Sequence, residues 1–379
     1  MRLHHLFRHA LSHPEQARRA IRNRLAESVY FLPGGRRAFP PSVVYLAVNS
    51  RCNLRCRTCD VGQGVEDSSF HAKLSGPARD MDPGQVARLL DGIVPARPRL
   101  SITSTEPLLH PALPDILALA RSRRMPTQLT TNGWLLAQKA DDLVAAGLDE
   151  LTISLDGPAA LHDRLRGVAG SFARAMEGWR RVNELKVRAR PARPLVSINF
   201  TICPDNASAL TEFLQAVAPM APDWVSFSHY NFVTPELAEE HNRACGHVGM
   251  VRPHGVAGLD PGAMDTAVLW DQLKRVKGMS LGFPVFFAPE MDTPEMVHAY
   301  YRDHCRRLGR RTCFAPWKHA QVLADGTLTV LTRCFDVSLG NVFQTPLATL
   351  WNGPAMRAFR AELRHRGQFP ACRRCCGVF

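Results

Sequence analysis

Short apolar runs alternate with longer amphipathic stretches over most of the chain. Six runs have the length and composition of buried β-strands, at residues 43–48, 99–103, 127–130, 148–155, 195–202 and 224–229. Five intervening stretches repeat their apolar positions at helical spacing, at residues 83–93, 111–123, 134–146, 172 to the 180s, and 207–218. Because parallel strands need crossover connections, this order predicts an α/β fold with a parallel sheet and right-handed crossovers.

Three further regions flank or interrupt this alternation. Residues 1–40 form a basic extension with apolar residues at helical spacing, which predicts a helix that packs on the domain or lies on a membrane surface. Residues 233–302 are rich in Gly, Pro and His, which predicts an irregular insertion that covers the substrate. Residues 303–379 carry a hairpin signal, Asp325-Gly326 between apolar runs, and a helical stretch at 350–364. The main α/β domain is then expected at 41–232.

The composition of the chain and its N-terminus indicate where in the cell the protein is located. The 379 residues are 45% hydrophobic, and no apolar run approaches the roughly 18 residues of a membrane-spanning helix. The N-terminus is basic but lacks the apolar core of a secretory signal. We therefore expect a cytoplasmic protein, with peripheral membrane contact through the N-terminal helix as the alternative. In that compartment the eleven cysteines are expected to be metal ligands rather than disulfides.

The formal net charge of +13 bears on the partners of the protein. A basic surface suits docking of an acidic electron donor or contact with an anionic membrane. The chain carries no helix-turn-helix signal and no aromatic RNA-binding signature, so we expect no nucleic-acid partner.

Three cysteines fall within eight residues shortly after the first predicted strand. Cys52, Cys56 and Cys59 have the spacing C-x3-C-x2-C, on a loop at a strand end, where α/β enzymes place their chemistry. Three thiolates can hold three irons of a [4Fe–4S] cluster and leave the fourth iron without a protein ligand, which is an open position of the kind that catalytic metal sites keep. The alternative is a zinc site, for which His71 is the obvious fourth ligand.

This cysteine motif resembles the signature of the radical S-adenosylmethionine (SAM) enzymes. The resemblance implies an open (β/α)6 partial barrel in which the fourth iron binds the amino and carboxylate groups of SAM. It also implies an electron donor such as a flavodoxin or ferredoxin, and cleavage of SAM to methionine and a 5′-deoxyadenosyl radical. The residue before the third cysteine is often aromatic in this family, and here it is Thr58.

Two further strand ends carry residues similar to those of the family. Glu106-Pro107 matches the end of a Gly-Gly-Glu-Pro motif whose Glu binds the SAM amino group, whereas Ser104 and Thr105 replace the two glycines. Since glycines permit close backbone approach to a ligand, the replacement changes the expected loop geometry. Thr131-Asn-Gly133 follows the third strand, as it does in family members.

The fourth and fifth strands complete the SAM site that the resemblance implies. Ser154 and Arg166 match residues that contact the SAM carboxylate, and a guanidinium can pair with a carboxylate through two hydrogen bonds. Asp156 shares a strand face with Ser154 and is expected to face substrate or ribose, which makes it a catalytic candidate. Asn199 is expected either to bind ribose or substrate or to be a satisfied core amide. Cys245 is either a hydrogen-atom donor to the substrate or a bystander.

Four more cysteines lie in the C-terminal region. Cys313 precedes the predicted hairpin, Cys334 follows it, and Cys372 and Cys375 form a C-x2-C pair in which Cys376 is an alternative to Cys375. Four thiolates suit zinc and a closed [4Fe–4S] cluster equally. The arrangement resembles the SPASM/twitch extension of radical SAM enzymes, which implies one auxiliary [4Fe–4S] cluster.

Together these motifs imply a radical SAM enzyme that removes a hydrogen atom from a small polar substrate. A sugar, an aminocyclitol or a glycosylated lipid is the expected substrate class, with net dehydrogenation or epimerisation. A peptide-modifying maturase is the alternative enzyme, and a non-catalytic metal or electron-transfer protein is the alternative of another class. Glu106, Ser154 and Arg166 favour an enzyme, because an electron carrier needs no SAM site.

Overall fold

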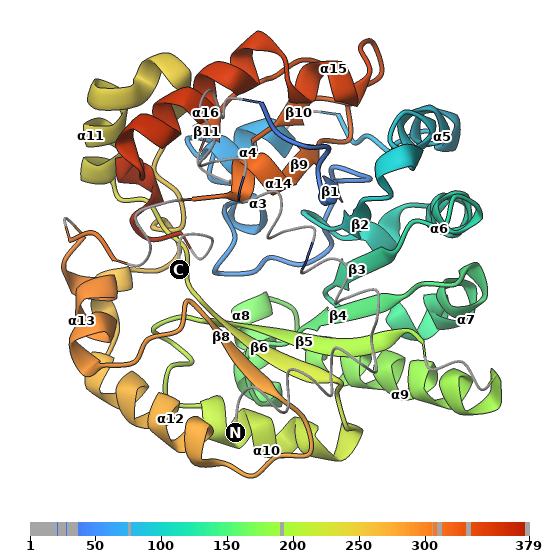
Figure 1. Cartoon of the computed structure of the whole chain (residues 1–379). Coiled ribbons are helices and arrows are strands. Elements are labelled where there is room, and N and C mark those ends of the chain that lie inside the picture. The colour runs from blue at the N-terminus through green and yellow to red at the C-terminus, as the bar shows by residue number, and fades with distance from the viewer. Residues whose placement is uncertain are drawn as a thin grey trace.

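Figure 1 shows the computed structural model of the chain. It describes Ile21, Ser28 and residues 37–74, 77–189, 193–304, 306–308, 313–330 and 335–375. The helix predicted within residues 1–40 falls almost entirely outside the described residues, as do Cys334 and Cys376.

The described strands form a nine-stranded sheet in the order β10-β9-β1-β2-β3-β4-β5-β6-β8. The six predicted strands are confirmed, and each pairs in parallel with the next along the chain. Their bounds are β1 (Val43–Leu46), β2 (Arg99–Ile102), β3 (Thr127–Thr131), β4 (Glu150–Ser154), β5 (Leu195–Ile202) and β6 (Trp224–His229). The carboxyl ends of these strands therefore meet at one edge, where the predicted motifs begin.

Helices cover the outer face of this sheet (Figure 1). Those expected between the strands are α5 (Pro83–Asp91), α6 (Leu113–Ser122), α7 (Leu136–Ala146), α9 (Ser171–Ala189) and α10 (Leu210–Val217). Shorter helices lie in the loops at the carboxyl ends: α3 (Asp60–Gln63), α4 (Ser69–Leu74) and α8 (Ala159–Arg166). The predicted helices are thus confirmed, with bounds that shift by a few residues.

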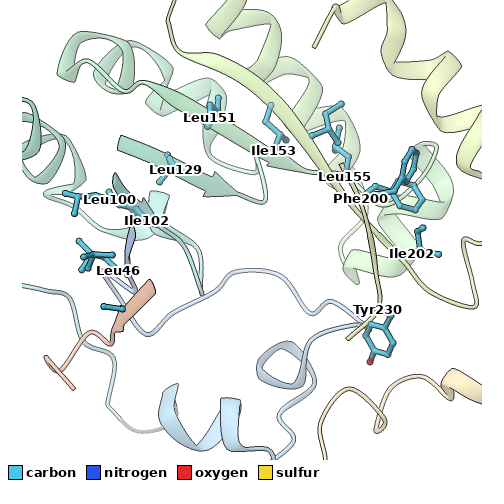
Figure 2. Packing of buried hydrophobic residues seen from close by; sticks show 14 of the residues in the cluster. Leu46, Leu100, Ile102, Leu129, Leu151, Ile153, Leu155, Phe200, Ile202 and Tyr230 are labelled. Carbon is cyan, nitrogen blue, oxygen red and sulfur yellow. The ribbon is translucent and has the colours of Figure 1, made fainter. Parts of the chain in front are cut away.

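The two faces of the strands differ in chemistry. Side chains such as Leu100, Leu129 and Leu151 are fully buried in one apolar core (Figure 2). Because successive side chains of a strand point to opposite faces, Ser101, Gln128 and their counterparts on β4 and β5 point to the inside of the partial barrel. The helices therefore cover an apolar face, and a polar face lines the concave side.

The expectation that residues 233–302 are irregular is wrong. The segment contains α11 (Pro235–Cys245), α12 (Thr266–Gly278), β8 (Val285–Ala288) and α13 (Pro294–Arg302). Each helix starts after a residue whose side chain accepts a backbone N–H bond, namely Thr234, Asp265 and Thr293. These caps were visible in the sequence. Since β8 pairs in parallel with β6, this segment adds one more β/α unit to the sheet.

The C-terminal region is joined directly to the main sheet. The predicted hairpin is confirmed: β9 (His319–Val322) and β10 (Leu328–Thr329) are antiparallel. β9 also pairs in parallel with β1, so this region extends the edge of the barrel. Its helices are α14 (Ala315–Lys318), α15 (Leu347–Trp351) and α16 (Pro354–Arg366). A two-stranded ladder joins β11 (Phe335–Asp336) to β7 (Met250–Val251).

Within the described part of the chain, no helix combines the length and the apolar character needed to cross a membrane.

Candidate active site

The loop that leaves β1 carries the three closely spaced cysteines. Cys52 is exposed, Cys56 is buried and Cys59 is half-buried. Cys59 N donates to Cys56 O at 3.1 Å, which closes a turn between the second and third cysteines. Burial raises the pKa of the Cys56 thiol, although the guanidinium of Arg166 opposes this shift. The loop thus presents three thiols from one short stretch of backbone.

The donor geometry distinguishes the two metals considered for this loop. A zinc ion needs its ligands around a single point, whereas a [4Fe–4S] cluster takes one thiolate on each ligated iron. Within the described ranges, which include Cys52, Cys56, Cys59 and His71, no three His, Cys, Asp or Glu side chains converge closely enough to hold one metal ion. The three thiols of the loop match in number and kind the three cysteine-ligated irons of a [4Fe–4S] cluster that keeps one iron open.

Glu106 lies beside this loop and is almost completely buried. Its Oε1 accepts hydrogen bonds from Leu108 N (3.0 Å) and Thr131 Oγ1 (2.7 Å), and its Oε2 accepts one from Asn132 N (2.7 Å). Burial raises the pKa of Glu106, and these donors oppose the shift. The fold thus brings the Glu-Pro and Thr-Asn-Gly motifs together into one corner.

Asn132 connects that corner to the cysteine loop. Its Nδ2 donates to Asn53 Oδ1 at 2.8 Å and lies 4.0 Å from Cys52 Sγ. A residue that the motifs did not reveal, Asn49, is fully buried below it and donates from Nδ2 to Glu106 O at 2.8 Å. The only sequence signal for Asn49 is a polar residue directly after an apolar strand.

The two residues that replace the family's glycines take different conformations. Ser104 has a φ of 100°, in a region that favours glycine. Thr105 instead anchors the loop, because its Oγ1 donates to Asn49, with distances of 2.6 Å to Oδ1 and 2.9 Å to the carbonyl oxygen. The loop therefore keeps a glycine-like turn without glycine.

Ser154 and Asn199 are neighbours on adjacent strands. They are direct partners in the register of β4 and β5, and both are half-buried. Asn199 Oδ1 accepts a hydrogen bond from Ser228 Oγ at 2.8 Å. These polar groups lie toward the carboxyl ends of β4, β5 and β6, which follow the strands of the Glu106 corner in the sheet. Their contact with SAM stays a prediction.

Asp156 and Arg166 form a buried ion pair, in which Arg166 Nη2 lies 2.7 Å from Asp156 Oδ2. The other carboxylate oxygen of Asp156 accepts Thr201 N at 2.9 Å. Its carboxylate therefore faces Arg166 and β5. The contact of Asp156 with substrate or ribose stays a prediction.

His162 and Asp163 follow β4 in the chain and lie next to the Asp156–Arg166 pair in sequence. Both lie inside α8, where His162 is buried and its Nδ1 accepts Asp156 N at 3.1 Å. Asp163 instead caps the next helix, α9, by accepting Gly170 N, Ser171 Oγ and Phe172 N.

The structure does not place Cys245 with these groups. It is the last residue of α11 and is buried. The charged groups that influence its thiol are Arg366 and Glu362 of α16 and Glu240 of α11, and burial raises its pKa. Arg366 Nη2 also donates to Ala244 O at 2.8 Å, which ties the two helices together. The bystander interpretation of Cys245 fits this position better than hydrogen donation.

Three of the four predicted auxiliary ligands lie within the described residues. Cys313 and Cys372 are buried, and Cys375 is half-buried. Cys375 N donates to Cys372 O at 3.2 Å, so the C-x2-C pair forms a turn like that of Cys56 and Cys59. Because Cys334 is not described, the shared site of the four cysteines stays a prediction.

A strap that the sequence did not suggest, residues 254–258, crosses the cysteine loop. The Asp60 carboxylate, directly after Cys59, accepts Gly255 N at 3.0 Å and Ser68 Oγ at 2.6 Å. A side chain at Gly258 would place its Cβ only 2.5 Å from Arg57 O. The strap therefore fixes the loop from the segment that was expected to cover substrate.

Comparisons with known proteins agree with this geometry. The chain matches the family model of the radical SAM superfamily over residues 46–217 and that of the SPASM iron–sulfur cluster-binding domain over residues 313–376. The cofactors that these two families imply are SAM and two [4Fe–4S] clusters.

Relatives of known function differ in how much of the chain they share. The chain is 28% identical over 338 residues to a pre-heme d1 synthase of Dinoroseobacter shibae, which covers 87% of this chain and 77% of that protein. It is 28% identical over 175 residues to an AdoMet-dependent heme synthase of Methanosarcina barkeri, where it covers 45% of this chain and 46% of that protein. The chain thus spans less than half the length of the second relative.

Solved structures share the fold. SuiB of Streptococcus suis, bound to SAM, superposes with a TM-score of 0.58 at 15% identity, over 85% of this chain and 68% of that one. The enzyme anSMEcpe with bound AdoMet gives a TM-score of 0.56 at 15% identity, over 84% of this chain and 82% of that one. The open parallel barrel, the three-cysteine loop and both family matches lead to one conclusion: the chain belongs to the radical SAM superfamily and carries a C-terminal SPASM domain.

Proposed function

We propose that this protein removes a hydrogen atom from a small polar substrate, with net dehydrogenation or epimerisation. A sugar, an aminocyclitol or a glycosylated lipid is the proposed substrate class. When bound, the cluster and SAM supply the 5′-deoxyadenosyl radical that abstracts the hydrogen atom. The chain's own residues hold SAM, orient one C–H bond and exclude water.

The observation that supports a polar substrate is the polar inside of the barrel. Hydrogen bonds of 3.0 Å join Ser101 to Gln128, Gln128 to Thr152 and Thr152 to Ser197, across β2 to β5. Above this row, Ser154, Asn199 and Ser228 line the strand ends. An apolar substrate would displace water from those polar groups and would offer no hydrogen bonds in its place. The hydroxyl or carboxylate groups of a polar substrate would instead form hydrogen bonds with them.

Different residues at the carboxyl ends of the strands would bind different parts of the cluster and of SAM. Cys52, Cys56 and Cys59 would hold the cluster. Glu106 would accept hydrogen bonds from the SAM ammonium, because a nearby cation favours the charged form of a carboxylate. Ser154 and Arg166 would bind the SAM carboxylate, with Asn199 beside the ribose or substrate.

A tetrapyrrole is the second substrate candidate. It is favoured by the pre-heme d1 synthase relative, whose similarity extends over 87% of the chain. The propionate groups of tetrapyrroles are anionic, and the chain carries a net charge of +13. A peptide substrate is the remaining alternative, because SuiB was solved with its precursor peptide.

The test uses anaerobically reconstituted full-length protein with SAM and dithionite. Mass spectrometry would follow 5′-deoxyadenosine, and deuterated candidates from the three classes would show which one transfers deuterium into it. We expect 5′-deoxyadenosine from the wild type and none from the variant with Cys52, Cys56 and Cys59 all changed to Ala. Equal formation by that variant would refute the enzymatic assignment, and deuterium from a leader-dependent peptide would replace the small-molecule proposal.

The auxiliary cluster and the electron donor have separate roles in this proposal. An auxiliary cluster held by Cys313, Cys334, Cys372 and Cys375 would accept the electron left on the substrate radical, or would orient the substrate. A flavodoxin or ferredoxin would deliver the first electron to the SAM-binding cluster, and the net charge of +13 would favour docking of such an acidic donor. Replacing dithionite by a reduced flavodoxin, at low and at high salt, measures how far charge guides that docking.

A further inference from the structure

The end of α8 holds the cysteine loop by its backbone on both sides of Cys56. Arg55 N donates to Arg166 O at 3.1 Å, and Arg57 N donates to Leu165 O at 2.9 Å. At Gly167, which has a φ of 70°, an added Cβ would lie 2.6 Å from Arg55 O. The close approach of the two backbones therefore fixes the position of Arg166 relative to Cys56.

The side chain of Arg166 uses this placement to reach the sulfur. Its Nη1 lies 3.7 Å from Cys56 Sγ, while its Nη2 lies 2.7 Å from Asp156 Oδ2. The side chain is only 11% exposed and that of Asp156 only 2%. The Nε of Arg166 is buried without a hydrogen-bond partner. The guanidinium is thus a buried cation between a carboxylate and a cluster ligand.

Asp156 is itself held from three directions. Its Oδ1 accepts Thr201 N at 2.9 Å, its backbone N–H donates to His162 Nδ1 at 3.1 Å, and its carbonyl accepts Asn206 Nδ2 at 3.0 Å. Neither partner of the ion pair can move away without breaking buried hydrogen bonds, which are costly to lose.

A fixed cation beside a thiolate ligand favours the more negative state of the cluster. Reduction adds one negative charge to the cluster and its sulfurs, and a buried charge is screened far less than one in water. Hydrogen bonds to the sulfurs and net charge are among the factors that set the potentials of iron–sulfur clusters. A nearby carboxylate has the opposite effect, because its negative charge favours the oxidised state of the cluster.

We propose that Arg166 sets the reduction potential of the SAM-binding cluster through the Cys56 sulfur, and that Asp156 positions Arg166 and limits its effect. This inference rests on the proposed function, because it requires a cluster at Cys52, Cys56 and Cys59. It adds a task to Arg166 beyond contact with the SAM carboxylate, and this task operates before SAM binds. Arg166 and Asp156 are positioning residues in this role.

The experiment is a potentiometric titration of the reconstituted full chain without SAM, followed by the EPR signal of the reduced cluster. In R166Q we expect about a tenfold lower ratio of reduced to oxidised cluster at a given potential, which is about 59 mV for a one-electron couple. In D156N, which keeps the guanidinium, the shift should have the opposite sign. R164Q changes an exposed arginine of the same helix and should titrate like the wild type.

Opposite shifts support electrostatic tuning, since simple loosening of the loop would move both variants in the same direction. If R166Q fails to retain iron, D156N still decides the matter, because an unchanged or lower potential in D156N overturns the inference. Unchanged potentials in both variants also overturn it. Formation of 5′-deoxyadenosine by the wild type tests the proposed function separately, so the two failures can be told apart.

Discussion

The glycine-like turn at Ser104 leads to a quantitative prediction about the loop that carries Glu106. Ser104 has a φ of 100°, which brings its Cβ close to backbone atoms. Residues held in such regions cost about 1–3 kcal/mol each. We therefore expect that replacing Ser104 by Gly relieves strain in the folded state.

Two smaller effects reduce this gain. Glycine increases the conformational entropy of the unfolded chain, which costs about 0.4–1 kcal/mol. The Ser104 hydroxyl also accepts a long hydrogen bond of 3.4 Å from Gln321 Nε2, which is lost when Ser104 is replaced by Gly or by Ala. The S104A variant loses the hydroxyl but keeps Cβ, so comparing it with S104G isolates the backbone contribution.

We expect S104G to be more stable than S104A by about 1 kcal/mol, which is the strain relieved less the entropy cost. Urea unfolding of the two apo variants, followed by tryptophan fluorescence and circular dichroism, measures the difference. If S104A is as stable as S104G or more so, the strain argument for this loop is wrong. SAM affinity, measured on the reconstituted variants, would show whether the strain also serves to place Glu106.

Three other predictions follow from named contacts. G258A should lose iron from the SAM-binding cluster faster than the wild type on gel filtration, because its Cβ would lie 2.5 Å from Arg57 O. The control is G278A, whose Cβ would have no atom within 4 Å and which should behave like the wild type. Equal iron loss in the two variants would show that the strap does not hold the loop. Burial lowers the pKa of His229 to about 3, so the unfolded state binds the proton at a higher pH than the folded state does. The free energy of unfolding therefore falls as the pH drops below about 6.5, by about 2 kcal/mol between pH 7 and 5 for one such histidine. H229F should lack that part of the loss in urea titrations, and a wild-type profile in H229F would contradict the buried neutral state. C375A and C376A should differ in iron content, with about four irons for the variant that lacks the auxiliary ligand and about eight for the other. Equal iron counts in the two variants would contradict the expectation that one of these two cysteines, and not the other, is the fourth ligand.

The local pattern of the chain determined the strands, the main helices and the C-terminal hairpin. Apolar periodicity reports which side of an element is buried, and Asp325-Gly326 specifies its own turn, so neither needs distant contacts. The spacing of Cys52, Cys56 and Cys59 is equally local, because all three lie on one short loop. In residues 233–302 composition and local signals disagree: the content of Gly, Pro and His is typical of irregular structure, whereas Thr234, Asp265 and Thr293 cap three helices.

Only the tertiary structure decided which distant segments meet. It placed β9 beside β1, Gly255 on Asp60, and Arg166 between Asp156 and Cys56. Each of these contacts joins residues that many positions of chain separate, so they depend on strand order and on how the crossovers close, which no local period encodes. The chemistry of the thiols could be read along the chain, whereas the charges that surround them arise only when the ends of β4 and α8 fold over the cysteine loop.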